Sequence, residues 1–225
     1  MRDERGYSLV ELLVSAAAGM IVLFALFAMF DLAAKNSAQV AQRVDATGRA
    51  KPAIQQLMND LHSTCTGPGI APVLAGSSET VLQFQGASGG GVAPTPQKYV
   101  VALEGENLTE KVYPASGGAN PTWTYSGTPI SDRILIEGVS APEPGDGSFF
   151  SYYASQAGVI ETAPLPMPLS AANAARAVQV KVGMQVAPSS QPIDDENASV
   201  SLTDAAVFRF SPFSEDPTKV NGPCM

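Results

Sequence analysis

An unbroken apolar run near the N-terminus constrains this chain more than any other feature. From Tyr7 to Phe30 the sequence has no Pro, Asn, Gln, Asp, Lys or Arg, and its single carboxylate is that of Glu11. A helix of about 20 residues crosses the hydrocarbon core of a membrane, so this run is long enough to span a bilayer. A charge inside such a span costs about 2.5–3.5 kcal/mol on insertion scales, so we expect Glu11 to have a partner.

The start of this run resembles the prepilin signature of type IV pilins and type II secretion pseudopilins. In that signature a short polar leader ends in Gly, an aromatic residue follows, and a Glu lies five residues after the Gly; here these are Gly6, Tyr7 and Glu11. The resemblance implies that a prepilin peptidase cuts after Gly6 and N-methylates Tyr7. It also implies that Glu11 neutralises the amino terminus of a neighbouring pilin or pseudopilin subunit in a filament.

Two other interpretations of the apolar run compete with this one. A secretory signal peptide has an apolar region of about 7–15 residues before a small-residue cleavage site, and Leu32-Ala33-Ala34 would be a poor one. This run is longer and has a Glu near its start. A plain single-span anchor would give no reason for the spacing of Gly6 and Glu11.

Charged residues do not orient the span, because Arg2 and Arg5 precede it while Lys35 and Arg43 follow it. The resemblance does orient it. It implies a single-pass protein of the cytoplasmic (inner) membrane with an extracytoplasmic head, which is then assembled into a cell-surface or periplasmic filament.

Beyond Phe30 the composition becomes polar while the helical period continues. Apolar or small side chains recur at steps of three and four, with Lys51 as the one misfit, at Val40, Val44, Thr47, Lys51, Ile54, Met58, Leu61 and Cys65. We therefore predict one helix over about residues 7–63, kinked around Gly48–Pro52 because a proline removes a helical hydrogen bond.

This pattern divides the chain into four parts. They are a prepilin leader (1–6), a transmembrane or filament-core helix (7–30), an amphipathic continuation of the helix (31–64) and an extracytoplasmic head (65–225).

The head is predicted to be rich in short strands that are separated by Gly, Pro and Ser loops. The predicted strands are Thr80–Gln85, Lys98–Leu103, Leu108–Tyr113, Arg133–Glu137, Phe149–Ala154, Ala177–Ala187 and Ala205–Phe210. Gly86–Pro96 and Ser116–Pro121 are predicted loops, and Ser170–Arg176 is predicted to form a helical turn. The expected fold class is α+β and pilin-like: a long N-terminal helix, transmembrane in its first half, packed on an antiparallel β-sheet head.

The two cysteines, Cys65 and Cys224, lie on the far side of the predicted anchor. That compartment is oxidising, which favours a disulfide between them over the alternative of two free thiols. Closing so long a loop would stabilise the head by about 5 kcal/mol in the chain-entropy model, which is an upper figure.

Charge and motifs argue against several other functions. The net charge is −8, and the sequence has no basic stripe with interleaved aromatic residues, so we expect no nucleic acid partner. Gly86–Gly90 fits the G-x-S-x-G elbow of hydrolases, but no helix-forming segment follows it. His62 is expected at the helix surface, and Asp194–Asn197 is interpreted as a solvated loop rather than a calcium site. We expect no enzyme activity, cofactor or metal.

Five later segments also resemble minor pilins of the PilW/J type, as a weaker pattern than the N-terminal motif. They are Gln56–Leu61, Asp132–Val139, Phe149–Tyr153, Ala174–Val180 and Leu202–Phe210. The predicted function is a minor pilin or pseudopilin of a type IV pilus or type II secretion filament that takes part in filament assembly or priming. Its partners would be prepilin peptidase, other pilin or pseudopilin subunits and the inner membrane. The alternative is a membrane-anchored or filament-tip adhesin or binding module.

Overall fold

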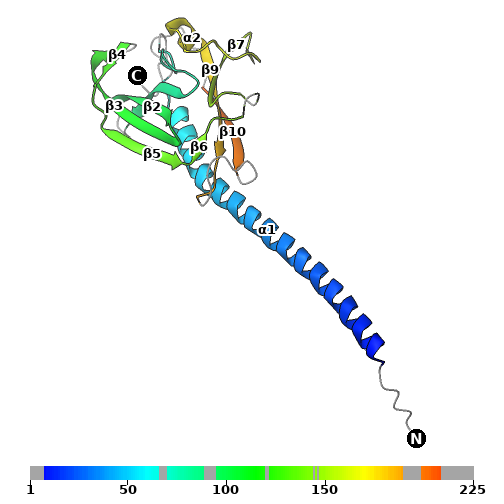
Figure 1. The fold of residues 1–225 in the computed structure, drawn as a ribbon. Coiled ribbons are helices and arrows are strands. Elements are labelled where there is room, and N and C mark those ends of the chain that lie inside the picture. The colour runs from blue at the N-terminus through cyan, green and yellow to red at the C-terminus, as the bar shows by residue number, and fades with distance from the viewer. Residues whose placement is uncertain are drawn as a thin grey trace.

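One long helix projects from a head made mainly of strands (Figure 1). The computed structural model describes residues 8–65, 70–88, 95–119, 122–143, 145, 147–189 and 199–208 of the chain. The long helix, α1, runs from Leu9 to His62. The buried positions of the helix begin at Ala46, and most of the helix before it extends away from the head.

The ends of α1 follow from capping groups. Ser8 is the N-cap, and its Oγ accepts a hydrogen bond from the backbone N–H of Glu11 at 3.2 Å. At the other end the N–H of Ser63 donates to the carbonyl of Asn59 at 3.1 Å. Pro52 lies inside the helix without ending it, so the prediction of one helix across residues 7–63 is confirmed to within two residues. The kink at Pro52 stays a prediction.

The apolar stripe predicted from Val40 to Cys65 is exposed in its first half, where an amphipathic helix would bury it. The side chains of Val40 and Val44 are 61% and 65% exposed, and Lys51 is exposed as well. Lys51 lies at the edge of the buried face, about 20° beyond Met58, because successive residues are about 100° apart. The buried face instead consists of Ala46, Ala50, Ala53, Ile54, Leu57, Met58 and Leu61.

The first sheet of the head is antiparallel and has the order β1-β2-β3-β4, with β5 paired to β3 beside β4. Its strands are β1 (Val81–Ser88), β2 (Thr95–Glu104), β3 (Asn107–Ala119), β4 (Thr122–Tyr125) and β5 (Ser131–Glu137). The chain turns from β2 to β3 through Gly105, whose φ of +63° suits glycine.

The second sheet is also antiparallel and has the order β10-β9-β7-β8, with β6 paired to β9. Its strands are β6 (Val139–Ser140), β7 (Phe150–Gln156), β8 (Val159–Ile160), β9 (Ala177–Val186) and β10 (Val200–Val207). A short helix, α2 (Ala171–Arg176), precedes β9 at the predicted helical turn. The chain passes from the first sheet to the second at Gly138, between β5 and β6.

One hydrophobic core joins α1 to both sheets. Its largest fully buried apolar and aromatic side chains come from the helix and from both sheets, and they include Leu57, Leu61, Leu82, Phe84, Leu108, Phe149, Phe150, Tyr152 and Met184. The rings of Phe84 and Tyr99 stack with centroids 5.0 Å apart. The predicted α+β arrangement is therefore confirmed, while the division of the strands between two sheets was not predicted.

The strand predictions are right in place and too short in several cases. The segment Ser116–Pro121 was expected to be a loop, but β3 continues to Ala119 because β4 pairs with it there. The expected loop Gly86–Pro96 is also shorter, since β1 and β2 pair as far as Ser88 and Thr95. Strand β10 begins at Val200 rather than Ala205. Strand pairing supplies hydrogen bonds that local composition does not reveal.

We predict that Leu57→Ala lowers the free energy of unfolding of the head by about 2–5 kcal/mol, because it leaves a cavity between the helix and the sheets. Val44→Ala, on the exposed part of the predicted stripe, should change it by less than about 0.5 kcal/mol. Urea unfolding of the full chain in detergent, followed by Trp123 fluorescence, measures both. Equal effects would contradict the buried face described here.

Candidate functional site

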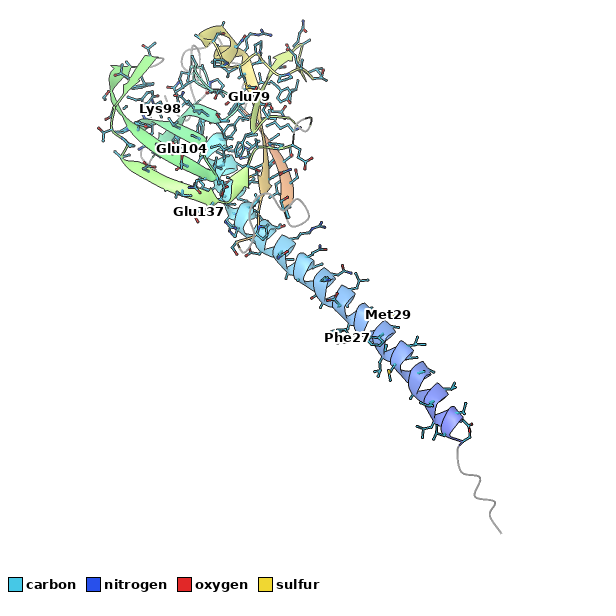
Figure 2. The ribbon with its side chains drawn as sticks, in the orientation of Figure 1. Phe27, Met29, Glu79, Lys98, Glu104 and Glu137 are labelled. Atoms are coloured by element: carbon cyan, nitrogen blue, oxygen red, sulfur yellow. The ribbon has the colours of Figure 1, made fainter. Side chains whose placement is uncertain are left out.

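The N-terminal part of α1 presents an apolar surface that the described part of the head does not cover. Large apolar side chains from Leu9 to Leu32 are between 58% and 77% exposed. Phe27 and Met29 are 74% and 70% exposed, and both project from the helix well away from the head (Figure 2). Among the described residues, α1 is the one helix long and apolar enough to cross a membrane. So large an apolar surface indicates a membrane or a protein partner.

Glu11 lies in the first turn of this helix, where its position is set by the cap. Ser8 accepts hydrogen bonds from two residues of that turn: its Oγ from the N–H of Glu11, and its carbonyl from the N–H of Leu12 at 3.1 Å. The Glu11 side chain is exposed at the helix end where the backbone N–H groups carry partial positive charge. Sequence reasoning missed the cap, although Ser8 and Glu11 have the S-x-x-E spacing of a capping box. Gly6 and Tyr7 lie outside the described residues.

Arg49 joins the helix to both sheets at the point where α1 leaves the head. One of its Nη atoms donates to the carbonyl of Ala187 at 3.1 Å, and the other donates to the carbonyl of Glu137. Glu137 ends β5 of the first sheet, and Ala187 follows β9 of the second. The N–H of Ala187 donates to the carbonyl of Gly138 at 2.9 Å, so the two sheets also meet here. Figure 2 shows Glu137 at this end of the head.

Asp45, one turn before Arg49, makes a second contact at the same junction. Its Oδ2 accepts hydrogen bonds from the N–H of Ser189 at 2.9 Å and from the Ser189 Oγ at 3.0 Å. These two hydrogen bonds hold the pKa of the Asp45 carboxyl below its ordinary value of 3.8. Their contribution to stability is therefore present above that value and is lost as the pH falls through the lowered pKa.

Neither Asp45 nor Arg49 was identified from the sequence. The acceptors of Arg49 are backbone carbonyls, which every residue has, so no pattern in the sequence marks them. The sequence offered one weak signal for Arg49. This charged residue lies between Ala46 and Ala50 in a segment of the helix that is rich in small side chains.

Cys65 follows the end of α1 and is 1% exposed. Its N–H donates to the carbonyl of Gln85 in β1 at 2.8 Å. Cys224 lies outside the described residues, so the disulfide between Cys65 and Cys224 stays a prediction.

The described ranges contain no group of three or more His, Cys, Asp and Glu side chains that could hold a metal ion. His62 is exposed in the last turn of α1, as expected. Asp194–Asn197 lies outside the described residues. Ser88 of the G-x-S-x-G segment ends strand β1.

A comparison with protein families matches residues 1–27 to the family model described as "Prokaryotic N-terminal methylation motif". The chain carries a prepilin-type N-terminus. The match includes Gly6, Tyr7 and Glu11 together with most of the exposed apolar run, and it supports a membrane-anchored, pilin-like precursor with an extracellular head. It also implies processing by prepilin peptidase and assembly with other pilins. Proteins with this motif are structural rather than catalytic. No match was found among the curated proteins.

We predict that Arg49→Lys lowers the free energy of unfolding of the head by about 1–3 kcal/mol. A single ammonium group cannot donate to both carbonyls in the geometry of the planar guanidinium. Hydrogen exchange at the Ala187 amide should become faster, since that amide lies beside the lost contact. Lys51→Ala is the matched control, on the exposed side of the same helix turn, and should change the free energy by less than about 0.5 kcal/mol. Unchanged exchange in Arg49→Lys would show that the junction does not depend on Arg49.

Proposed function

We propose that this chain is a minor pilin or pseudopilin of a type IV pilus or type II secretion filament, and that it takes part in filament assembly or priming. The observation that carries the proposal is the coincidence of the methylation motif with a projecting, uncovered apolar helix. A filament subunit needs both features: a membrane span before assembly and a helix that packs against other subunits afterwards.

The dimensions of α1 suit both states. Residues 9–30 extend about 33 Å at 1.5 Å per residue, which spans a hydrocarbon core of about 30 Å. Residues 31–45 extend about 22 Å further and separate the membrane from the head. The first charged pair after the span is that of Asp31 and Lys35, whose atoms are 2.8 Å apart. The junction at Asp45 and Arg49 fixes the direction in which this helix leaves the head.

Assembly would proceed in three steps. The precursor inserts in the inner membrane with residues 1–6 in the cytoplasm and the head outside. Prepilin peptidase cuts between Gly6 and Tyr7. The helix then leaves the lipid for a bundle of neighbouring helices, where Glu11 pairs with the Tyr7 amine of another subunit. The small residues Ala16–Gly19 would allow close approach of helices in that bundle.

Processing can be tested by the intact mass and N-terminal sequence of the membrane-extracted protein, with and without a co-expressed prepilin peptidase. We expect a start at Tyr7 with one added methyl group, only when the peptidase is present. The same mass reports the disulfide, because joining Cys65 to Cys224 removes the two thiol hydrogens. A start at Met1 under both conditions would indicate a plain anchor, and a start near Lys35 would indicate a secreted protein.

The role of Glu11 can be tested by replacing it with Gln, which keeps the shape and removes the charge. We expect Glu11→Gln to insert normally in the membrane but to be depleted from sheared filaments, because the buried amine of the neighbour loses its counter-charge; breaking such a pair typically costs about 3–5 kcal/mol. Ser15→Ala, one turn further along the same helix, is the control and should be incorporated like the unmodified protein. Unchanged incorporation of Glu11→Gln would favour a position of this subunit at the tip of the filament, where no subunit above it presents an amine to Glu11.

A further inference from the structure

Glu110 is an acidic residue buried where the first sheet meets the helix. It is 1% exposed, and it shares its face of β3 with Leu108 and Val112, which are 0% and 7% exposed. An ionised carboxylate at a buried position is unfavourable unless both of its oxygens accept hydrogen bonds.

The two carboxyl oxygens of Glu110 have different surroundings. Arg133, directly opposite on β5, donates from Nε to Oε1 at 2.9 Å, and its Nη2 lies 2.7 Å from the same oxygen. Oε2 is buried and has no hydrogen-bond partner among the described residues. An arginine that binds an ionised carboxylate commonly places one donor on each oxygen. The observed arrangement suits a protonated acid instead, with Oε1 as the carbonyl oxygen and Oε2 as the hydroxyl.

The neighbour that could accept this proton is Asp60, in the last turns of α1. Its carboxyl and that of Glu110 both approach the same guanidinium nitrogen, Arg133 Nη2. Gln56 Nε2 donates to both oxygens of Asp60, at 3.1 Å and 3.0 Å, and Arg133 Nη2 lies 4.0 Å from Oδ2. Asp60 thus has donors for its charge, whereas Glu110 Oε2 has none among the described residues.

The charged and titratable groups around Glu110 come from three elements. Asp60 approaches from α1, Arg133 from β5 and Tyr99 from β2. Two carboxyl groups therefore share one guanidinium, and full ionisation would leave one negative charge uncompensated in a buried site.

We propose that Glu110 keeps its proton at pH values where an ordinary glutamate is ionised, and that its Oε2 donates a hydrogen bond to Asp60. This hydrogen bond then joins the end of α1 to the first sheet. It is lost when Glu110 loses its proton at higher pH, and the contact between helix and sheet becomes weaker. This inference is independent of the methylation motif and of filament assembly.

The balance of forces on Glu110 agrees with this arrangement. Burial, and next the negative charge of Asp60, raise the pKa of the Glu110 carboxyl above its ordinary value of 4.5, while Arg133 opposes the rise. The folded head therefore binds more protons than the unfolded chain from about pH 4.5 up to the raised pKa. Its stability consequently falls as the pH rises through that window.

Infrared spectroscopy of the full chain in detergent tests the proposal directly. At about pH 6, above the ordinary pKa of a glutamate, we expect the carbonyl band of a protonated carboxylic acid in the unmodified protein. Glu110→Gln should lose this band. Glu104→Gln is the matched control, since Glu104 is on the same sheet but half exposed and paired with Lys111 at 2.8 Å, and should keep it. Absence of the band from the unmodified protein would show that Glu110 is ionised and would overturn the proposal.

Thermal unfolding gives a second and separate measurement. The midpoint should fall as the pH is raised above about 4.5 in the unmodified protein and in Glu104→Gln, and this fall should be smaller in Glu110→Gln, whose amide imitates the protonated acid. If Glu110→Gln instead lowers the unfolding midpoint by the same amount at every pH, relative to the unmodified protein, Glu110 forms a simple ion pair with Arg133 and the proposal is wrong.

A third variant keeps the test valid if Glu110→Gln does not fold. Asp60→Asn removes the neighbouring negative charge, so the Glu110 band should disappear at a lower pH than in the unmodified protein. A band with unchanged pH dependence in this variant would overturn the link to Asp60.

Discussion

The apolar surface of residues 9–32 has to be removed from water, and the described part of the head does not do this. Removing this surface from water is favourable by about 25 cal/mol per Å². A bilayer or a bundle of similar helices can bury it. The rest of the molecule is arranged so that this surface stays available. The head buries side chains of the helix from Ala46 onwards, and the charged pair Asp31–Lys35 begins the polar segment between them.

The proposed transfer of this helix from lipid to filament requires a firm attachment between the helix and its head. The described contacts provide this at two levels. Near the point where the helix leaves the head, Asp45 and Arg49 bind backbone groups of both sheets or of the segment that follows β9. Deeper in the head, Leu57 and Leu61 lie in the common core, and Arg133 of β5 approaches both Asp60 of the helix and Glu110 of β3. The helix and the two sheets therefore act as one body, and a force on the helix reaches both sheets.

Much of this fold could be predicted because its signals are local. The course of α1 up to Pro52 follows from the lack of proline in that segment, and the alternation of β9 marks a strand. The predictions failed where a distant strand decides the outcome. Ser116–Ala119 has the composition of a loop, but it is a strand because β4 pairs with it. Val40 and Val44 continue a helical stripe, but the head does not reach them.

By itself, the sequence determined the anchor, the prepilin-type signature and the α+β class, because each depends on residues close together along the chain. Only the tertiary structure decided which face of α1 is buried, how the strands divide between two sheets, and which groups meet Glu110. Arg133 and Asp60 are 23 and 50 residues from Glu110 in the chain. Only the folding of the sheet against the helix brings the two carboxyl groups and the guanidinium together, and the burial of Glu110 strengthens the interaction between their charges.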